Sequence, residues 1–203
     1  MGENNRQFEA MLAVVRERLA RHTPEEIAEH AAVHYESGTI FCKTLGQDVC
    51  ISLPDCAVEP PLSKWHTLTL LHYLDLADGT PLSGEVMTFG QYPSGMVRGG
   101  GFDRSAEEII RRDLGALTSG ELERRCRALG AEILPSNADF CARFEFAPRY
   151  PVFLRLWFAD EEFPASGRVL VDRNAAHYLT VEDAVSVGEL ILDRLTGAGH
   201  WNA

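Results

Sequence analysis

Three polar residues near the C-terminal end have side chains suited to chemistry: Asp172, Asn174 and His177. Asp172 ends the apolar run 169–171, which is typical of a buried β-strand, and core strands fix the side chains at their ends. An imidazole titrates near neutral pH, so a carboxylate at Asp172 that orients His177 would form a general acid–base pair. Alternatively, Asp172 or Asn174 caps a turn and His177 donates to a nearby carbonyl. Both interpretations stay open.

Four side chains are candidates for ligand binding: His72, Trp157, Asn174 and Tyr178. Asn174 and Tyr178 belong to the same short connection as His177, which leads into an amphipathic helix. His72 shares a helix face with three apolar residues, Trp65, Leu68 and Leu76, and is therefore expected to be buried. A buried histidine on an apolar face is more often structural than catalytic.

The potential metal ligands form no recognisable pattern, and no metal site is predicted. His30 and His34 are four residues apart on a predicted helix, but two imidazoles do not make a site. The cysteines at 42, 50, 56, 126 and 141 lack iron–sulfur and zinc-ribbon spacing, although a hairpin would bring Cys42 near Cys50. Buried free thiols are expected. The three carboxylates at 160–162 indicate a solvated turn rather than a Ca²⁺ loop.

The segment 91–103 is the loosest part of the chain, with glycines at 95, 99, 100 and 101. It lacks the Gly-Lys-Ser/Thr of a phosphate-binding loop, and Glu107 and Glu108 would repel an anion at the start of the next helix. A flap or a simple loop is therefore predicted.

Helical periodicity and capping signals position these residues along the chain. Residues 5–21 have apolar positions at helical spacing, and Thr23-Pro24 with Glu26 forms a capping box for a second helix that fades near residue 35. Residues 63–77 are apolar almost all round, which predicts a deeply buried helix. Further capping signals begin short helices at 105 and 118 and the last helix, which starts at 180 and runs to about 195.

The strand signals are dispersed among these helices. Residues 39–43 and 48–53 predict a hairpin, and further strands are expected at 85–89, 132–134, 139–146, 152–158 and 168–172. The order lacks the regular alternation of a doubly wound fold. We therefore predict one α+β domain over residues 1–203, with an antiparallel or mixed sheet of about five to seven strands covered by helices.

Composition limits the partners. The formal net charge is −11, which disfavours nucleic acid and anionic membrane surfaces, since both are bound through clustered Lys and Arg. The apolar fraction of 45% is that of an ordinary globular domain. The N-terminal residues show no signal-peptide core, and no run is long enough to span a bilayer. We therefore expect a cytoplasmic protein with free thiols.

Several motifs resemble the domain of unknown function numbered 3786. The first two motifs are Leu-Leu-His-Tyr-Leu at 70–74 and Asp-Gly-Thr-Pro-Leu-Ser-Gly at 78–84. The others are Trp157 together with the acidic segment 160–166, the strand segment 169–172, and the segment 176–183 that contains His177. The resemblance covers about residues 23–195, between an N-terminal helix in 1–22 and an expected flexible tail at 196–203. It implies a bacterial or archaeal family that is frequent in anaerobes and sometimes joined to an iron–sulfur domain. The chain lacks such a cysteine cluster, and the family name implies no activity.

Three functional hypotheses follow. The first is an accessory module of anaerobic-type metabolism that binds a small molecule or a metallocofactor, or presents one to a redox partner protein. It rests on the acidic charge, the lack of a complete catalytic triad and the iron–sulfur companion that the resemblance implies. The second is an enzyme in which His177 is the general acid–base, Asp172 orients it and the glycine-rich segment closes as a lid. The third is a structural protein-interaction domain. The sequence identifies neither the cofactor nor the oligomeric state.

Overall fold

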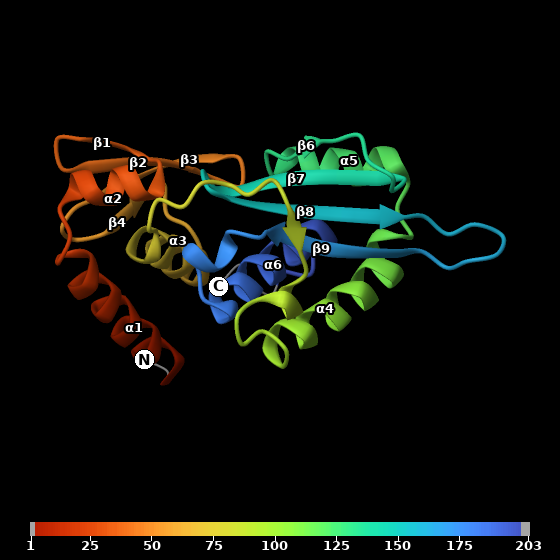
Figure 1. Ribbon diagram of the computed structural model, residues 1–203, viewed down its shortest axis with the longest axis horizontal. Coiled ribbons are helices and arrows are strands. Elements are labelled where there is room, and N and C mark those ends of the chain that lie inside the picture. Colours follow the sequence, from red (N-terminus) through yellow and green to blue (C-terminus); the bar gives the residue numbers. More distant parts are fainter. Residues whose placement is uncertain (1–2, 200–203) are drawn as a thin grey trace.

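The computed structural model describes residues 3–199 (Figure 1). Within this range, nine strands form two separate antiparallel sheets. The first sheet has the order β1-β2-β3-β4, with bounds His34–Glu36, Thr39–Thr44, Gln47–Ser52 and Ala57–Glu59. The second has the order β5-β9-β8-β7-β6; in chain order these strands are Val86–Met87, Glu132–Ile133, Phe140–Ala147, Tyr150–Trp157 and Ser166–Asp172.

In the described part of the chain, six α-helices pack around the sheets: α1 (Glu3–Leu19), α2 (Pro24–Ala31), α3 (Lys64–Leu76), α4 (Arg98–Ile109), α5 (Ser119–Ala128) and α6 (Val181–Thr196). Helix α4 continues into a π-helical turn, η2 (Ile110–Leu114), and two 3-10 turns are η1 (Phe89–Gln91) and η3 (Ala175–His177). The predicted α+β class is therefore confirmed. The strands form two sheets instead of one because β1–β4 pair only among themselves. Residues 200–203 of the expected tail lie outside the described residues.

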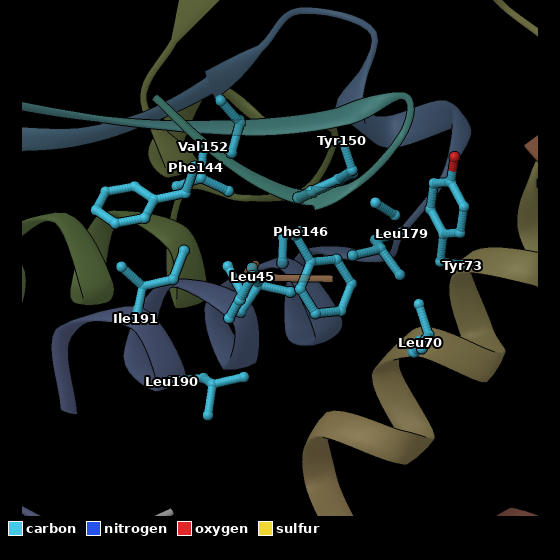
Figure 2. Close-up of a cluster of buried hydrophobic side chains, with 14 of the residues drawn as sticks. Leu45, Leu70, Tyr73, Phe144, Phe146, Tyr150, Val152, Leu179, Leu190 and Ile191 are labelled. Atoms are coloured by element: carbon cyan, nitrogen blue, oxygen red, sulfur yellow. The ribbon is translucent and has the colours of Figure 1, made fainter. Parts of the chain in front are cut away.

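One hydrophobic core joins the two sheets. On β8, Val152, Leu154 and Leu156 are buried and alternate with partly exposed side chains, as expected for a strand with one covered face. Figure 2 shows that this buried cluster combines Phe144 of β7 with Ile191 of α6 and also side chains from α3 and from the first sheet. The side chain from the first sheet is that of Leu45, which lies in the β2–β3 turn and is 1% exposed.

The contact between the sheets requires glycine at the hairpin turn. Leu45 donates its backbone N–H to the Glu145 carbonyl of β7 at 2.8 Å. The next residue, Gly46, has φ +80°, and a Cβ there would lie 2.8 Å from the backbone nitrogen of Gly130. A side chain at Gly46 would be strained by its backbone conformation and would also separate the two sheets.

Helix α3 is buried as its sequence predicts. Leu70, Leu71 and Tyr73 are 0% exposed, and the Tyr73 hydroxyl donates to the Ala31 carbonyl of α2 at 2.7 Å. His72 departs from the prediction because its side chain remains 22% exposed, whereas His66 on the same helix is buried. Burial lowers the pKa of His66 to about 3, so this imidazole is neutral and bonds Thr44 Oγ1 at 2.7 Å.

Several local predictions were wrong. Residue 105, expected to begin a short helix, lies inside α4 (Arg98–Ile109). The second helix ends at Ala31, because Ala32 adopts the left-handed conformation with φ 53°, and His34 instead pairs with Phe41 in the first sheet. His30 and His34 therefore do not share a helix face. The glycines at 99–101 are helical, within α4, and Gly99 packs so closely on η1 that a Cβ there would lie 2.0 Å from the Phe89 carbonyl oxygen. Close packing against η1 outweighs the low helix propensity of glycine.

Candidate functional site

The candidate site is built on the loop 78–84, which leads from α3 towards β5 (Figure 1) and is hydrogen-bonded to the connection between β9 and α6. Asp172 secures one end of this loop. Its Oδ1 accepts hydrogen bonds from Ser83 N at 3.0 Å, Ser83 Oγ at 2.8 Å and Asn174 N at 2.9 Å, and its Oδ2 accepts from Gly84 N at 3.0 Å. The carboxylate is therefore fully engaged in holding the loop on β9.

Asp172 holds the loop from a buried position. It is only 3% exposed, and burial acts to raise the pKa of its carboxyl group. The hydrogen bonds from Asn174, Ser83 and Gly84 outweigh this effect, so the pKa of Asp172 lies below its ordinary value. Asp172 forms no hydrogen bond with His177 within the described residues, which differs from the pairing that the sequence predicts. The physical reason is that its oxygens already accept from four closer donors.

Other side chains bind the carbonyls at the beginning of the loop. Asn174 Nδ2 donates to Pro81 O at 3.2 Å, and the Tyr178 hydroxyl donates to Thr80 O. Arg149 donates from one guanidinium nitrogen to Gly79 O and also to His30 O of α2. The loop backbone is thus held from both sides, which leaves the side chains of Asp78 and Thr80 to interact with neighbouring residues.

His177 meets the loop at Asp78. The Nδ1 atom of His177 lies 2.7 Å from Asp78 Oδ2 and 3.2 Å from Thr80 Oγ1. Partial desolvation acts to raise the pKa of Asp78, but hydrogen bonds from Thr80 and His177 outweigh it and lower the pKa to about 2. Asp78 is therefore ionised at neutral pH and acts only as an acceptor, so Nδ1 of His177 carries the proton that it donates.

This tautomer determines what His177 can do. In the neutral ring with Nδ1 protonated, Nε2 has a free lone pair. Nε2 has no hydrogen-bond partner in the part of the chain that the structure describes, and the His177 side chain is 49% exposed. The ring can therefore accept a hydrogen bond or a proton at Nε2, or bind a metal there, while Asp78 fixes its orientation.

A buried acceptor lies under the same loop. Asn174 is 4% exposed, and its Oδ1 has no hydrogen-bond donor among the described residues. Asn174 also accepts the backbone N–H of His177 at 2.8 Å through its own carbonyl, so the two residues belong to one turn, η3. We call Asp78, Thr80, Asn174, His177 and Tyr178 the loop site.

The structure brings together four of the six residues predicted from the sequence: Asp172, Asn174, His177 and Tyr178. His72 has a different partner, because its Nδ1 lies 2.7 Å from Asp183 Oδ1 at the start of α6. Trp157 lines a separate cavity beside β9. The prediction that these two residues bind a ligand stays untested.

Sequence reasoning missed three residues that form or hold the candidate site: Asp78, Thr80 and Arg149. The turn sequence Asp-Gly-Thr-Pro at 78–81 marks a rigid exposed loop and is the signal that should have directed attention to Asp78 and Thr80. Arg149 follows a proline in a hairpin connection, and no local pattern indicates that its guanidinium reaches Gly79, 70 residues away in sequence.

The site does not contain a complete set of metal ligands. Among residues 3–199, no group of three or more His, Cys, Asp or Glu side chains is arranged to hold a metal ion. The five cysteines are all free; Cys42 pairs with Val49 and Cys50 with Phe41, so the two thiols point to opposite faces of the hairpin. Also within residues 3–199, no helix combines the length and apolarity that crossing a bilayer requires.

Fold and site together define an α+β protein that carries an exposed carboxylate–histidine pair on a loop fixed to the end of a sheet. The family model described as Domain of unknown function (DUF3786) matches residues 23–194, and the chain belongs to this family. The matched range includes the loop site and Asp172. Searches of curated proteins and of solved structures found no match.

Proposed function

We propose that this protein is a small-ligand-binding module whose ligand contacts Nε2 of His177. One observation carries the proposal: Asp78 holds Nδ1 of His177 at 2.7 Å while the ring stays half exposed and Nε2 is unengaged by described residues. The imidazole is thus oriented before any ligand arrives, and the entropy cost of fixing it is already met by folding. Asn174 Oδ1 offers a second acceptor under the same loop.

The chemistry of Nε2 limits the ligand class. A neutral imidazole with a free Nε2 accepts a hydrogen bond, so a ligand with an N–H or O–H donor fits. A metallocofactor that carries its own ligands and has one open coordination position fits as well, because it needs only one imidazole from the protein. A bare metal ion fits less well, since the described residues supply no group of three ligands.

A second candidate is an enzyme that uses His177 as general base. The observation that favours it is the same carboxylate–imidazole contact, with Asp78 in the orienting role that the sequence assigned to Asp172. The ionised Asp78 would stabilise the imidazolium that forms when Nε2 takes a proton. Turnover of a bound ligand, rather than binding alone, separates this candidate from the first.

We also propose a setting, which the free thiols support. In this proposal the protein works in the cytosol of an organism with anaerobic-type metabolism, where its free cysteines would stay reduced and a redox partner protein would receive or deliver the ligand. A third role, as a structural interaction domain, would use the same fold without a ligand.

The test is native mass spectrometry of anaerobically purified protein, with metal analysis and an absorption spectrum. A stoichiometric small molecule or metallocofactor is expected on the wild type and is lost in His177→Ala. His34→Ala is the matched control, because His34 is also exposed and pairs with a carboxylate, Glu36, at 3.7 Å. Equal ligand content in the wild type and His177→Ala, or a wild type without bound ligand, would contradict the proposal.

A further inference from the structure

A groove runs along the edge of β9, on the far side of this strand from β8. The edge strand β5 pairs with only two residues of β9, Val171 and Asp172, so among the described residues 3–199 the segment 166–170 has no strand partner on that side. A cavity of about 400 Å³ follows this open edge between β5 and α4. A neighbouring hollow of about 230 Å³ shares Thr88, Glu107 and Arg168 with it. The groove is large enough for a small molecule.

Two arginines face each other on the wall of this groove. Arg155 of β8 and Arg168 of β9 are direct cross-strand partners, so their side chains stand on the same face of the sheet. Like charges at directly opposed positions destabilise a sheet unless an opposite charge neutralises them. Neither arginine forms an ion pair within the described range, although the chain has a net charge of −11.

Arg155 also lacks an acceptor that its burial calls for. Its Nε atom is buried and has no hydrogen-bond partner among the described residues. A buried guanidinium N–H without an acceptor is costly, and a carboxylate or phosphate accepts two parallel N–H bonds from such a fork. The arginine pair therefore fits a small anion.

The remaining lining gives the ligand its shape. Trp157 lies two residues from Arg155 on the same strand and hence on the same face, so it offers an aromatic plane beside the two guanidinium groups. Glu107 of α4 lines the opposite side and would repel an anionic group. The anionic end of a ligand is thus directed towards the sheet.

The open edge adds backbone groups. Just after β9, Arg173 donates its N–H to Glu85 O of the segment before β5. In an antiparallel sheet every second residue of a strand directs its N–H and C=O to the same neighbour, so every second residue of β9, counted back from Arg173, directs these groups to the β5 side. By that alternation, Gly167 and Val169 present their unpaired backbone groups to the groove that they line. They can bond polar atoms on the rim of a flat ligand.

We propose that this groove is a second binding site, for a small planar carboxylate whose anionic group pairs with Arg155 and Arg168 and whose ring packs on Trp157. It shares no residue with the loop site and does not depend on the proposed function of His177. The affinity arises locally, because the overall negative charge of the protein opposes anion binding.

The test follows the indole N–H signal of Trp157 by NMR, assigned through Trp157→Phe, during titration with four probes. Benzoate is planar and anionic, benzamide is planar and neutral, cyclohexanecarboxylate is anionic but not flat, and inorganic phosphate has no ring. Saturable binding is expected for benzoate, with benzamide and phosphate at least about tenfold weaker and cyclohexanecarboxylate between them.

Two variants test the arginines. Arg168→Gln should weaken benzoate binding about tenfold, and this exposed position keeps the fold intact. Arg155→Gln should do the same, and Arg127→Gln on α5 is the control for a simple change in net charge. Equal binding of benzoate and benzamide, equal binding of phosphate and benzoate, or unchanged affinity in Arg168→Gln would each overturn the proposal, as would the absence of a saturable shift at Trp157.

Discussion

Asp172 gives the sharpest test of how the loop site is held. Replacing it with Asn keeps the shape and leaves one oxygen, which can occupy the Oδ1 position and accept from Ser83 and Asn174. The amide nitrogen then faces the Gly84 N–H, which loses its acceptor in a partly buried contact. Losing one hydrogen bond to a charged acceptor costs roughly 1.5–3 kcal/mol, so we expect a destabilisation of about 2–3 kcal/mol at pH 7.

The pH dependence of this loss has a definite sign. The folded-state pKa of Asp172 is lowered, so its contribution is fully present above the unfolded pKa of about 3.9 and is lost as pH falls through the folded value. The difference in free energy of unfolding between wild type and Asp172→Asn should therefore shrink below about pH 4.

Urea denaturation at several pH values measures both effects. Asp160→Asn is the matched control, since Asp160 also accepts two backbone N–H bonds, from Glu162 and Phe163, but in an exposed turn. We expect the control to lose less than about 1 kcal/mol. A loss below about 0.5 kcal/mol for Asp172→Asn at pH 7, or a difference that stays constant into acid, would refute this account of the loop.

Three other predictions concern the core, a helix and the thiols. Leu71→Ala, at a fully buried position of α3, should cost about 2–5 kcal/mol in urea denaturation, and a shift below a quarter of that would show a peripheral helix. Gly99→Ala should strongly lower the free energy of unfolding, because its Cβ would overlap the Phe89 carbonyl. Gly101→Ala has open space around it and should raise the free energy of unfolding by about 0.5–1 kcal/mol. Equal effects of the two substitutions in urea denaturation would contradict the packing of α4. All five thiols should react with a thiol reagent in denaturant without prior reduction, and finding only three reactive thiols would indicate a disulfide. In the native protein, burial raises the pKa of Cys42 to about 12, so this thiol should react slowly.

Local sequence signals predicted most of the secondary structure. The capping box at Thr23, the hairpin around Leu45-Gly46 and the buried α3 all have the expected form. The last helix begins as its sequence indicates, since Thr180 Oγ1 accepts the Asp183 N–H. Each of these signals acts within a few residues, which is why a single sequence suffices to detect it.

The errors arise where distant segments decide the outcome. The glycines at 99–101 lie in helix α4, where Gly99 packs against η1, and no local propensity indicates that contact. His177 and its carboxylate partner Asp78 are 99 residues apart in sequence. Asp172 is much closer to His177 in sequence and was therefore predicted as its partner. Both oxygens of Asp172 instead accept hydrogen bonds from the loop residues Ser83 and Gly84 and from Asn174. Three residues of the loop site, Asn174, His177 and Tyr178, were predicted from the sequence. Asp78, Thr80 and the pairing of Asp78 with His177 were not.

The central claim is that Asp78 holds His177 with Nδ1 protonated and Nε2 free. Nitrogen-15 NMR of the imidazole above its titration range measures this directly, because the protonated and unprotonated ring nitrogens have very different shifts. The account predicts the Nδ1–H form for His177 in the wild type and a shift towards the Nε2–H form in Asp78→Asn. A wild-type His177 that is predominantly Nε2–H, or a tautomer ratio that Asp78→Asn leaves unchanged, would contradict it.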